Sequence, residues 1–324
     1  MTHISIRRFI AIAAFAVAAG ALDAQTPGGE GFPSPQAAAK ALVDAAKKND
    51  VDGVLKILGP SAENIVITND AVADENSRKD FVEKAVEKMR VVADPDQPSR
   101  KILEVGASNW PLPIPIVKVN GKWYFDAEQG LKEILLRRIG DNELTAVNFC
   151  QGFVEAQLAY AEMDPDKRGR PHYAQKIISS EGTRDGLYWK SDNPNDESPI
   201  GALVAQALQE GYKDKSAPYH GYYFKVLTGQ GQHASGGAMS YLDNGVMTKG
   251  FAIVAWPSEY KVTGVMTFQV DRTGILYEKD LGEKTADIAN AITNYDPDRT
   301  WAPVPSSGDS EPQLIVQFQS QRPR

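Results

Sequence analysis

The sequence is poor in cysteine and has no excess of positive charge. It contains one cysteine in 324 residues, so no disulfide can form within the chain. The formal net charge at pH 7 is -7, from 35 Lys and Arg against 42 Asp and Glu. General nucleic-acid binders neutralise phosphates with clustered Lys and Arg, so the acidic balance argues against a nucleic-acid partner.

Periodic glycine and heptad patterns are also missing, which excludes collagen and coiled coils. Hydrophobic residues make up 42% of the chain and charged residues 24%, a balance that allows a packed core and argues against wholesale disorder. After residue 24 no apolar run is long enough to cross a membrane, since a spanning helix needs about 20 such residues. The composition therefore predicts a globular protein.

The N-terminal segment has the pattern of a targeting signal. Arg7 and Arg8 precede an apolar run over residues 9–19, and small residues suited to signal peptidase follow. We interpret residues 1–24 as a signal peptide and residues 25–31 as a flexible linker. The mature protein is then expected in the periplasm or outside the cell, with no membrane span after cleavage. A single membrane anchor is the alternative interpretation.

The first part of the mature chain predicts helices followed by a meander of strands. Ser34 and Pro35 indicate the start of a helix over residues 35–46, and Asp50 indicates the start of a second. Helical spacing continues over residues 78–92. Strands are expected at residues 102–105, 112–119 and 122–126, with Asn120-Gly121 as a hairpin turn. We therefore expect an N-terminal α+β domain over residues 32–140, with an NTF2-like or cystatin-like arrangement.

The second part predicts a long helix packed on an antiparallel sheet. Residues 128–138 should form one helix, the chain should enter a new domain near Gly140-Asp141, and an apolar stripe from Asn142 to Ala161 predicts another helix. Aromatic and β-branched runs predict strands at residues 222–227, 251–256, 265–270 and 275–277. The expected C-terminal domain covers residues 141–304, and residues 305–324 are expected to be a flexible tail. The predicted fold class is α+β.

Several motifs together resemble one family. They are Trp110 to Pro115, Asn148 to Gln151 with Tyr160, Asp185 to Trp189, Gly221 to Leu227, and Gly250 to Pro257. This series resembles the secreted bacterial proteins catalogued as domain of unknown function 2950, over roughly residues 32–304. The resemblance implies export, and the family name implies no activity.

The C-terminal part is also similar to the globular heads of type IV pilins and pseudopilins. The similarity rests on residues 156–160, 173–174, 221–224 and 268–274. It implies one helix packed into an antiparallel sheet. True pilins carry an apolar helix with an acidic residue near its start ahead of the head, and this sequence has none, which opposes pilin-type filament assembly.

The residues that could carry catalytic or metal chemistry are few. His172, His220 and His233 make no metal-type spacing with one another or with Cys150, so we expect no structural zinc site and a packing role for each histidine. No Gly-x-Ser-x-Gly elbow occurs. Cys150 has no cationic neighbour in the sequence and is expected to be a buried, inert thiol.

Two acidic loops contain many oxygen donors. Residues 164–169 begin like a calcium loop, but Arg168 occupies a position that needs an acceptor and no bidentate glutamate follows. A second loop, over residues 191–198, could bind calcium weakly, with capping of the next helix as the alternative explanation of its acidity. Its candidate ligands are Asp192, Asn193, Asn195 and Asp196. No other cofactor is expected.

Four residues are candidates for binding a ligand or partner. Tyr219 and Tyr223 belong to an aromatic segment in which at least one tyrosine should face solvent. Gly229 and Gly231 lie in the glycine-rich run 229–237, which lacks the Lys-Ser/Thr of a phosphate loop and is better explained as a loop between strands.

The leading hypothesis is an exported, noncatalytic envelope protein with a binding or scaffolding role, whose partner would be an envelope protein or a glycan. One alternative is a periplasmic hydrolase that uses carboxylates of the N-terminal domain, such as Asp126 or Glu104, although Asp126 is better placed to cap a helix. The other is a pilus or secretion-system accessory subunit. No catalytic residue is assigned.

Overall fold

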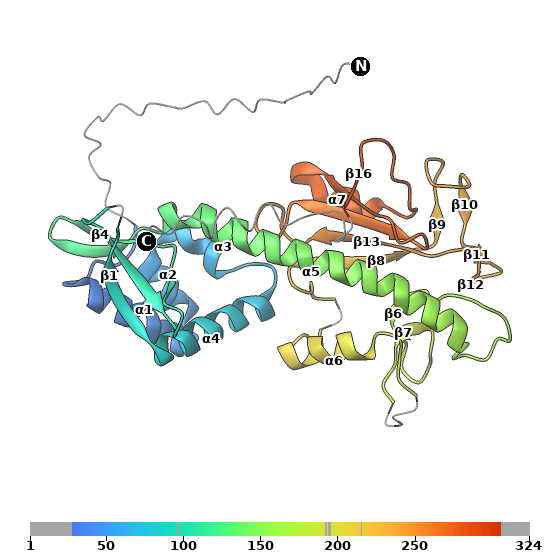
Figure 1. Cartoon of the computed structure of the whole chain (residues 1–324), viewed down its shortest axis with the longest axis horizontal. Coiled ribbons are helices and arrows are strands. Elements are labelled where there is room, and N and C mark those ends of the chain that lie inside the picture. Colours follow the sequence, from blue (N-terminus) through green and yellow to red (C-terminus); the bar gives the residue numbers. More distant parts are fainter. Residues whose placement is uncertain (1–27, 96, 192, 194–195, 215, 306–324) are drawn as a thin grey trace, which may run out of the picture.

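The computed structural model describes residues 28–305, apart from residues 96, 192, 194–195 and 215. The predicted signal peptide, residues 25–27 of the predicted linker and residues 306–324 of the predicted tail lie outside the described residues. Two groups of helices and strands lie along one long helix, as Figure 1 shows. The predicted α+β class is confirmed.

The N-terminal group combines a cluster of helices with one antiparallel sheet. Its elements are α1 (Pro35–Lys47), α2 (Val51–Leu58), a 3-10 turn (Pro60–Ala62), α3 (Glu63–Val66), α4 (Ala71–Glu87), β1 (Met89–Ala93), β2 (Lys101–Val105), β3 (Trp110–Pro111), β4 (Ile116–Val119) and β5 (Lys122–Phe125). The strand order is β1-β2-β4-β5, and β3 pairs with β2. The helices α1 and α4 pack against this sheet.

Local signals account for the boundaries of the first elements. Ser34 caps α1 by accepting a hydrogen bond from the Ala37 N–H at 3.1 Å, and Asp50 caps α2 through the Gly53 N–H at 2.9 Å. Asn120 and Gly121 have φ values of 49° and 82° between β4 and β5. Positive φ at both central residues is what a type I′ hairpin turn requires, so the predicted hairpin forms.

The helix predicted over residues 78–92 was wrong at both ends. Helix α4 begins at Ala71, after Asp70 as its cap, and it ends at Glu87. Residues 89–93 form β1 instead, with Val91 opposite Leu103 in β2. The helical spacing continues past Glu87, but valines at 91 and 92 suit a strand, and pairing with β2 satisfies their backbone groups.

Helix α5 (Ala127–Met163) is continuous over 37 residues, a length of about 55 Å. The two helices predicted over this stretch are therefore one. The boundary expected near Gly140-Asp141 lies inside α5, because one exposed glycine weakens a helix without ending it. Asp126 caps α5 through the Gln129 N–H, as the sequence suggested.

The C-terminal group is built around a five-stranded antiparallel sheet of order β16-β15-β14-β13-β8. Its elements are β6 (Lys176–Ile178), β7 (Gly186–Tyr188), α6 (Gly201–Glu210), β8 (Tyr222–Leu227), β9 (Gly229–Gln230), β10 (Met239–Ser240), β11 (Leu242–Asp243), β12 (Val246–Met247), β13 (Ala252–Pro257), β14 (Met266–Asp271), β15 (Leu276–Asp280), a 3-10 turn (Gly282–Lys284), α7 (Thr285–Ala291) and β16 (Ala302–Pro303). Strands β8, β13 and β14 lie within one residue of their predicted positions, and β15 extends further.

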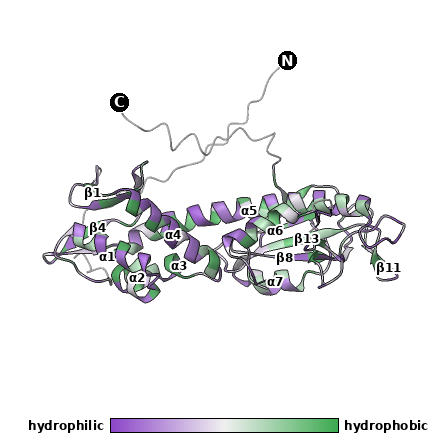
Figure 2. Ribbon diagram, turned by 90° about the horizontal axis from the view of Figure 1, so that it is seen from below, coloured by the Kyte–Doolittle hydropathy of each residue, from purple (hydrophilic) through white to green (hydrophobic). Residues whose placement is uncertain are grey.

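Two hydrophobic clusters lie on either side of the middle of α5. One packs the helices α1, α2 and α4 against the first sheet, with Leu103, Ile116 and Phe125 fully buried. The other packs the second half of α5 on the C-terminal sheet, with Phe153 and Phe268 each 2% exposed. Figure 2 shows the hydropathy of both groups along the ribbon. The domain division at residue 140 stays a prediction.

Within the described residues, no helix is both long and apolar enough to cross a membrane.

Candidate functional site

A cavity of about 600 Å³ lies between the N-terminal sheet, the helices α1, α2 and α4, and the first half of α5. This volume is within the range of pockets that bind small organic molecules. The apolar part of its lining comes from Leu42, Val54, Leu58, Phe81, Val105, Trp110, Leu112, Ile114 and Ile134. One end reaches the junction with the C-terminal group, where Tyr212, His220 and Thr263 complete the wall.

An arginine and a buried aspartate face this cavity from opposite helices. Arg138 on α5 donates to the carbonyl oxygens of Asn64 at 2.6 Å and Ile65 at 2.5 Å. A guanidinium has five N–H donors, so donors remain beyond these two bonds. Burial lowers the pKa of Arg138, and the charges of Asp74 and Glu259 oppose that shift. No carboxylate of the described residues lies within ion-pair distance of Arg138.

Asp74 on α4 is 9% exposed and also lines the cavity. Burial raises the pKa of its carboxyl above the ordinary value, although hydrogen bonds from Thr68 lower it in part. Those bonds come from the Thr68 N–H at 2.7 Å and its hydroxyl at 2.9 Å. A buried carboxyl and a partly buried guanidinium in the lining of one largely apolar cavity make it the candidate site.

The junction wall of the cavity is held by hydrogen bonds between distant segments. Asp70 caps α4 through the Ala73 N–H at 2.9 Å with one oxygen. Its other oxygen accepts the Tyr212 hydroxyl at 3.0 Å and the Gly221 N–H at 2.8 Å. Since Asp70 is 2% exposed, these contacts are shielded from water and fix the cavity end relative to the C-terminal sheet.

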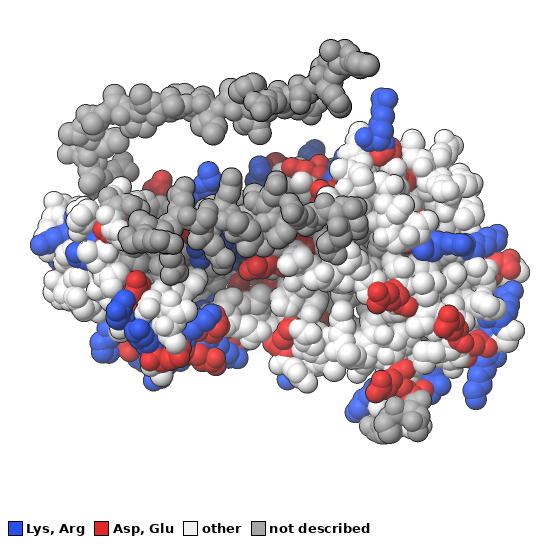
Figure 3. All heavy atoms as spheres, in the orientation of Figure 1, with Lys and Arg blue, Asp and Glu red and all other residues white. Residues whose placement is uncertain are grey.

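Helix α5 makes further contacts at this junction. The Asn142 amide, which lines the cavity, donates to the Thr263 carbonyl at 2.8 Å. The Glu143 carboxylate accepts the N–H groups of Val265 at 2.8 Å and Met266 at 2.9 Å, at the start of β14. The surface in Figure 3 intermixes acidic and basic side chains on the face shown.

The predicted binding tyrosines pack against other rings. Tyr219 is half-buried, with its ring centroid 5.0 Å from that of Tyr212 and 4.5 Å from that of His220. Burial raises the pKa of Tyr219 to about 12. Tyr223 lies 5.8 Å from Trp256, centroid to centroid, on the neighbouring strand. A binding role for either tyrosine stays a prediction.

The predicted binding glycines lie where another segment approaches closely. A Cβ on Gly229 would stand 2.6 Å from Asn294 Oδ1, and one on Gly231 would stand 2.1 Å from the carboxyl carbon of Asp296. The Gly231 N–H donates to the Tyr295 carbonyl at 2.9 Å. Strand β8, which is about 20 Å long, lies between Tyr219 and these two glycines. The two tyrosines and two glycines predicted to bind a ligand therefore do not form one site.

The two carboxylates of the hydrolase hypothesis lie outside the lining of the cavity. Asp126 is the cap of α5. Glu104 on β2 pairs with Arg90 on β1, with 2.6 Å between the Arg90 Nη2 and Glu104 Oε2 atoms. The structure does not bring them together with Arg138.

The predicted calcium loop is described only in part, because Asp192 and Asn195 lie outside the described residues. Asn193 is exposed. One Asp196 carboxylate oxygen accepts hydrogen bonds from the Arg184 guanidinium and from the Ser191 hydroxyl. The calcium hypothesis therefore stays a prediction.

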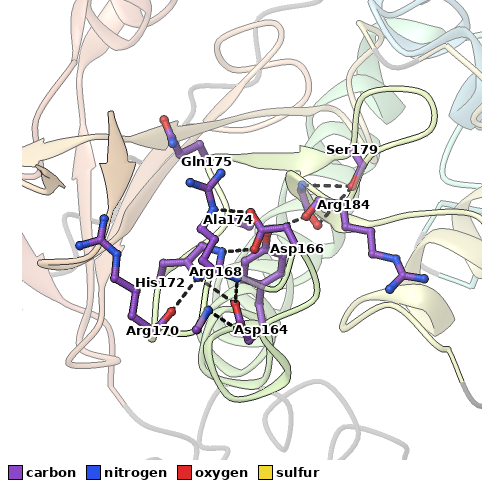
Figure 4. Close-up of polar contacts among 12 residues, drawn as sticks. Asp164, Asp166, Arg168, Arg170, His172, Ala174, Gln175, Ser179 and Arg184 are labelled. Atoms are coloured by element: carbon purple, nitrogen blue, oxygen red, sulfur yellow. Dashed lines mark hydrogen bonds and ion pairs between the residues drawn. The ribbon is translucent and has the colours of Figure 1, made fainter. Parts of the chain in front are cut away.

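The histidines each have an acidic neighbour. His220 Nε2 lies 2.8 Å from Glu210 Oε2, and His233 Nδ1 lies 3.1 Å from Asp296 Oδ2. His172 is the buried one, at 2% exposed. It lies with Asp164 and Asp166 in a loop after α5, and one candidate ligand atom of each residue is within 4.8 Å of the others (Figure 4).

Sequence reasoning missed both groups, for different reasons. Asp74 and Arg138 are far apart in the chain, and only the tertiary fold places both in the lining of one cavity. The spacing of Asp164, Asp166 and His172 was available locally, within nine residues. Histidine–histidine and histidine–cysteine spacings do not contain this group, and the calcium-loop pattern does not include a histidine.

Comparison with known proteins gives one match. The model of a family described as "Protein of unknown function (DUF2950)" matches residues 30–304. No curated protein and no solved structure matches the chain. The similarity to pilin heads therefore stays a prediction.

Proposed function

The chain belongs to the DUF2950 family, and on that premise we propose that it is an exported binding protein whose cavity takes a small amphipathic organic anion. The apolar end of the ligand would lie among the core side chains, and its acidic group would meet Arg138. The single observation that carries this proposal is a partly buried guanidinium with spare donors at the edge of an apolar cavity.

Export is part of the proposal and rests on the sequence. Arg7 and Arg8, the apolar run over residues 9–19 and the small residues after it support cleavage by signal peptidase and a periplasmic or secreted location. A binding protein in that compartment would meet small molecules that enter from outside.

The chemistry of the cavity supports an anion with an apolar body. A side chain such as Phe81 or Ile134 gives a ligand apolar surface to cover, at about 25 cal/mol per Å² removed from water. Arg138 presents N–H donors in the planar arrangement that suits a carboxylate. A volume of about 600 Å³ favours a small molecule over the envelope protein or glycan considered from the sequence.

A second candidate function is hydrolysis, and one observation favours it. Asp74 lines the cavity with a raised pKa, which is the condition of a general acid or base. Both of its oxygens already accept hydrogen bonds from Thr68, which favours a structural role. Turnover of an ester or amide probe that disappears in Asp74→Asn would favour hydrolysis over simple binding.

The binding proposal is tested with decanoate, decanol and decylamine as probes of one chain length and different charge. Titration calorimetry should give decanoate the highest affinity. Arg138→Gln should weaken decanoate binding about tenfold or more, because a charge-assisted hydrogen bond contributes about 1.5–3 kcal/mol. Decanol binding should change little, since it has no charge for Arg138 to meet.

Lys132→Gln supplies the matched control, because Lys132 is an exposed cation on the same helix and is not among the lining residues. It should leave decanoate affinity unchanged. Thermal melts verify that Arg138→Gln is folded, since its bonds to Asn64 and Ile65 are also lost. Equal binding of all three probes, or equal losses in both variants, would contradict the proposal.

A further inference from the structure

The loop after α5 arranges three potential metal ligands on a fixed backbone. Helix α5 ends with Asp164 in the left-handed conformation, at φ 43°. The Asp164 carboxylate accepts hydrogen bonds from the N–H groups of Arg168 at 2.9 Å and Gly169 at 2.7 Å. These two bonds fix the backbone of the loop around the Asp164 side chain.

The buried His172 side chain is held in one orientation in this loop. Its side chain is 3% exposed, and its Nδ1 atom lies 3.1 Å from the carbonyl oxygen of Arg170. A carbonyl only accepts hydrogen bonds, so this contact assigns the hydrogen of a neutral imidazole to Nδ1. The lone pair is then on Nε2. Metal-binding histidines are oriented in this way, with the second ring nitrogen donating to a carbonyl or carboxylate.

The lone pair of Nε2 faces a carboxylate oxygen. His172 Nε2 and Asp166 Oδ1 are 2.7 Å apart, and neither atom has a hydrogen-bond partner of acceptable geometry, although both are buried. Two acceptors at this separation repel each other unless a positive charge lies with them. The other oxygen of Asp166 is occupied by the Arg168 guanidinium, which leaves Oδ1 free for a cation.

We propose that Asp164, Asp166 and His172 bind one divalent metal ion of the zinc type. One imidazole nitrogen with two carboxylate oxygens is a donor set that suits zinc and its first-row neighbours, whereas calcium prefers oxygen ligands alone. The carboxylates of Asp164 and Asp166 are 28% and 22% exposed, so an ion can enter from solvent. Water would complete the coordination.

The surroundings give the site a structural role. The Tyr160 ring meets His172 edge to face, at 5.4 Å between centroids, and shields one side of the imidazole. Buried Gln157 on α5 exchanges two hydrogen bonds with the backbone of Ala174, at 2.8 and 2.9 Å. A metal bound at residues 164, 166 and 172 would add a second link between the end of α5 and the segment that leads to β6.

The test measures zinc binding by the purified protein after removal of metals with EDTA. We expect one zinc per chain by elemental analysis after dialysis, a rise in Tm with zinc, and a smaller rise with calcium at the same concentration. Asp166→Asn keeps the shape of the side chain and should weaken zinc binding about tenfold or more, with loss of the zinc-dependent rise in Tm. His172→Gln should do the same.

Asp243→Asn is the matched control, because Asp243 is a nearby acid that approaches Arg170 at 3.7 Å and is not one of the three ligands. It should bind zinc like the unmodified protein. If His172 and Asp166 form only an ion pair with a protonated imidazole, Asp166→Asn will lower Tm equally in EDTA and in zinc, which would overturn the proposal. Unchanged zinc affinity in a folded Asp166→Asn protein would overturn it too. The result is independent of decanoate binding in the cavity.

Discussion

Tyr212 donates its hydroxyl hydrogen to Asp70, with 3.0 Å between the two oxygen atoms, although the residues are 142 positions apart in the chain. Asp70 is the cap of α4, and Tyr212 follows α6. Burial and the nearby Asp70 charge raise the pKa of Tyr212, so the hydroxyl stays protonated as a donor. The same oxygen of Asp70 accepts the Gly221 N–H. The hydrogen bonds of Asp70 therefore connect α4, in the N-terminal group of helices and strands, to Tyr212 and Gly221 in the C-terminal group, at the wall of the candidate cavity.

Removal of either partner should destabilise the protein. Tyr212→Phe removes the hydrogen bond to a buried carboxylate and the acceptor of the His220 N–H, and it should lower the free energy of unfolding by about 1.5–3 kcal/mol. Asp70→Ala also removes the cap and leaves the Gly221 N–H without its partner, so its effect should be larger, about 3 kcal/mol or more. Urea unfolding of both variants measures these changes.

A double variant shows whether the effect belongs to the pair. In Asp70→Ala with Tyr212→Phe, the combined loss should be smaller than the sum of the two single losses, because one bond is counted in both. Strictly additive losses would mean that the two side chains do not interact in solution.

Asp74 should make stability depend on pH. Burial raises its pKa in the folded protein, so the protonated form favours folding. The resulting stabilisation is complete below the pKa of the unfolded chain, about 4, and is lost as pH rises through the folded pKa. Asp74→Asn cannot ionise, so its stability relative to the unmodified protein should increase between pH 4 and pH 7.

Asp80→Asn is the comparison for this measurement. Asp80 lies on the same helix but is exposed, and its partner is Lys84 one turn away. Asp80→Asn removes a charge that is exposed to solvent, so no buried carboxylate is neutralised. The change in urea midpoint that it causes should therefore be about the same at pH 4 and at pH 7. A pH-independent difference for Asp74→Asn would show that its carboxyl keeps an ordinary pKa in the fold.

Cys150 should be unreactive in the native state. The side chain is fully buried on α5, and burial raises the pKa of the thiol, so almost no thiolate exists at neutral pH. Ellman's reagent should therefore label no thiol in buffer and one thiol per chain in guanidinium chloride. Rapid labelling of the folded protein would show that α5 separates from the C-terminal sheet more readily than the structure implies.

Sequence reasoning succeeded where the signal was local. Ser34, Asp50 and Asp126 each cap a helix with their own side chain, and Asn120-Gly121 supplies the backbone angles of its turn. These features depend on neighbours within a few positions, so the residue types alone predict them.

The cavity could not be predicted in this way. Asp74 on α4 and Arg138 on α5 line the same cavity only because of the tertiary fold, and no local pattern in the sequence predicts that two residues so far apart in the chain share it. The strand at residues 89–93 was missed for a related reason, since pairing with β2 overrides a helical spacing that continues from α4. In contrast, the group of Asp164, Asp166 and His172 lies in one loop and was within reach of the sequence.

The continuity of α5 at Gly140 gives the last prediction. The sequence suggested a boundary at Gly140-Asp141, but Gly140 is an exposed position inside the helix, where the methyl group of an alanine would meet only open space. Gly140→Ala should therefore raise the free energy of unfolding by about 0.5–1 kcal/mol, and Gly140→Pro should lower it by about 3 kcal/mol or more, because proline removes a helix hydrogen bond and clashes with the preceding turn.

Gly121 provides a control in which the same substitution by alanine should lower the free energy of unfolding. It also has open space at the Cβ position, but its φ is 82°, which strains any other residue. Gly121→Ala should lower stability by about 1 kcal/mol, so the two alanine variants separate backbone conformation from packing. If α5 were two helices joined at residue 140, Gly140→Pro would be tolerated. A large loss of stability in that variant, measured by urea unfolding, therefore requires that one helix connects the two hydrophobic clusters.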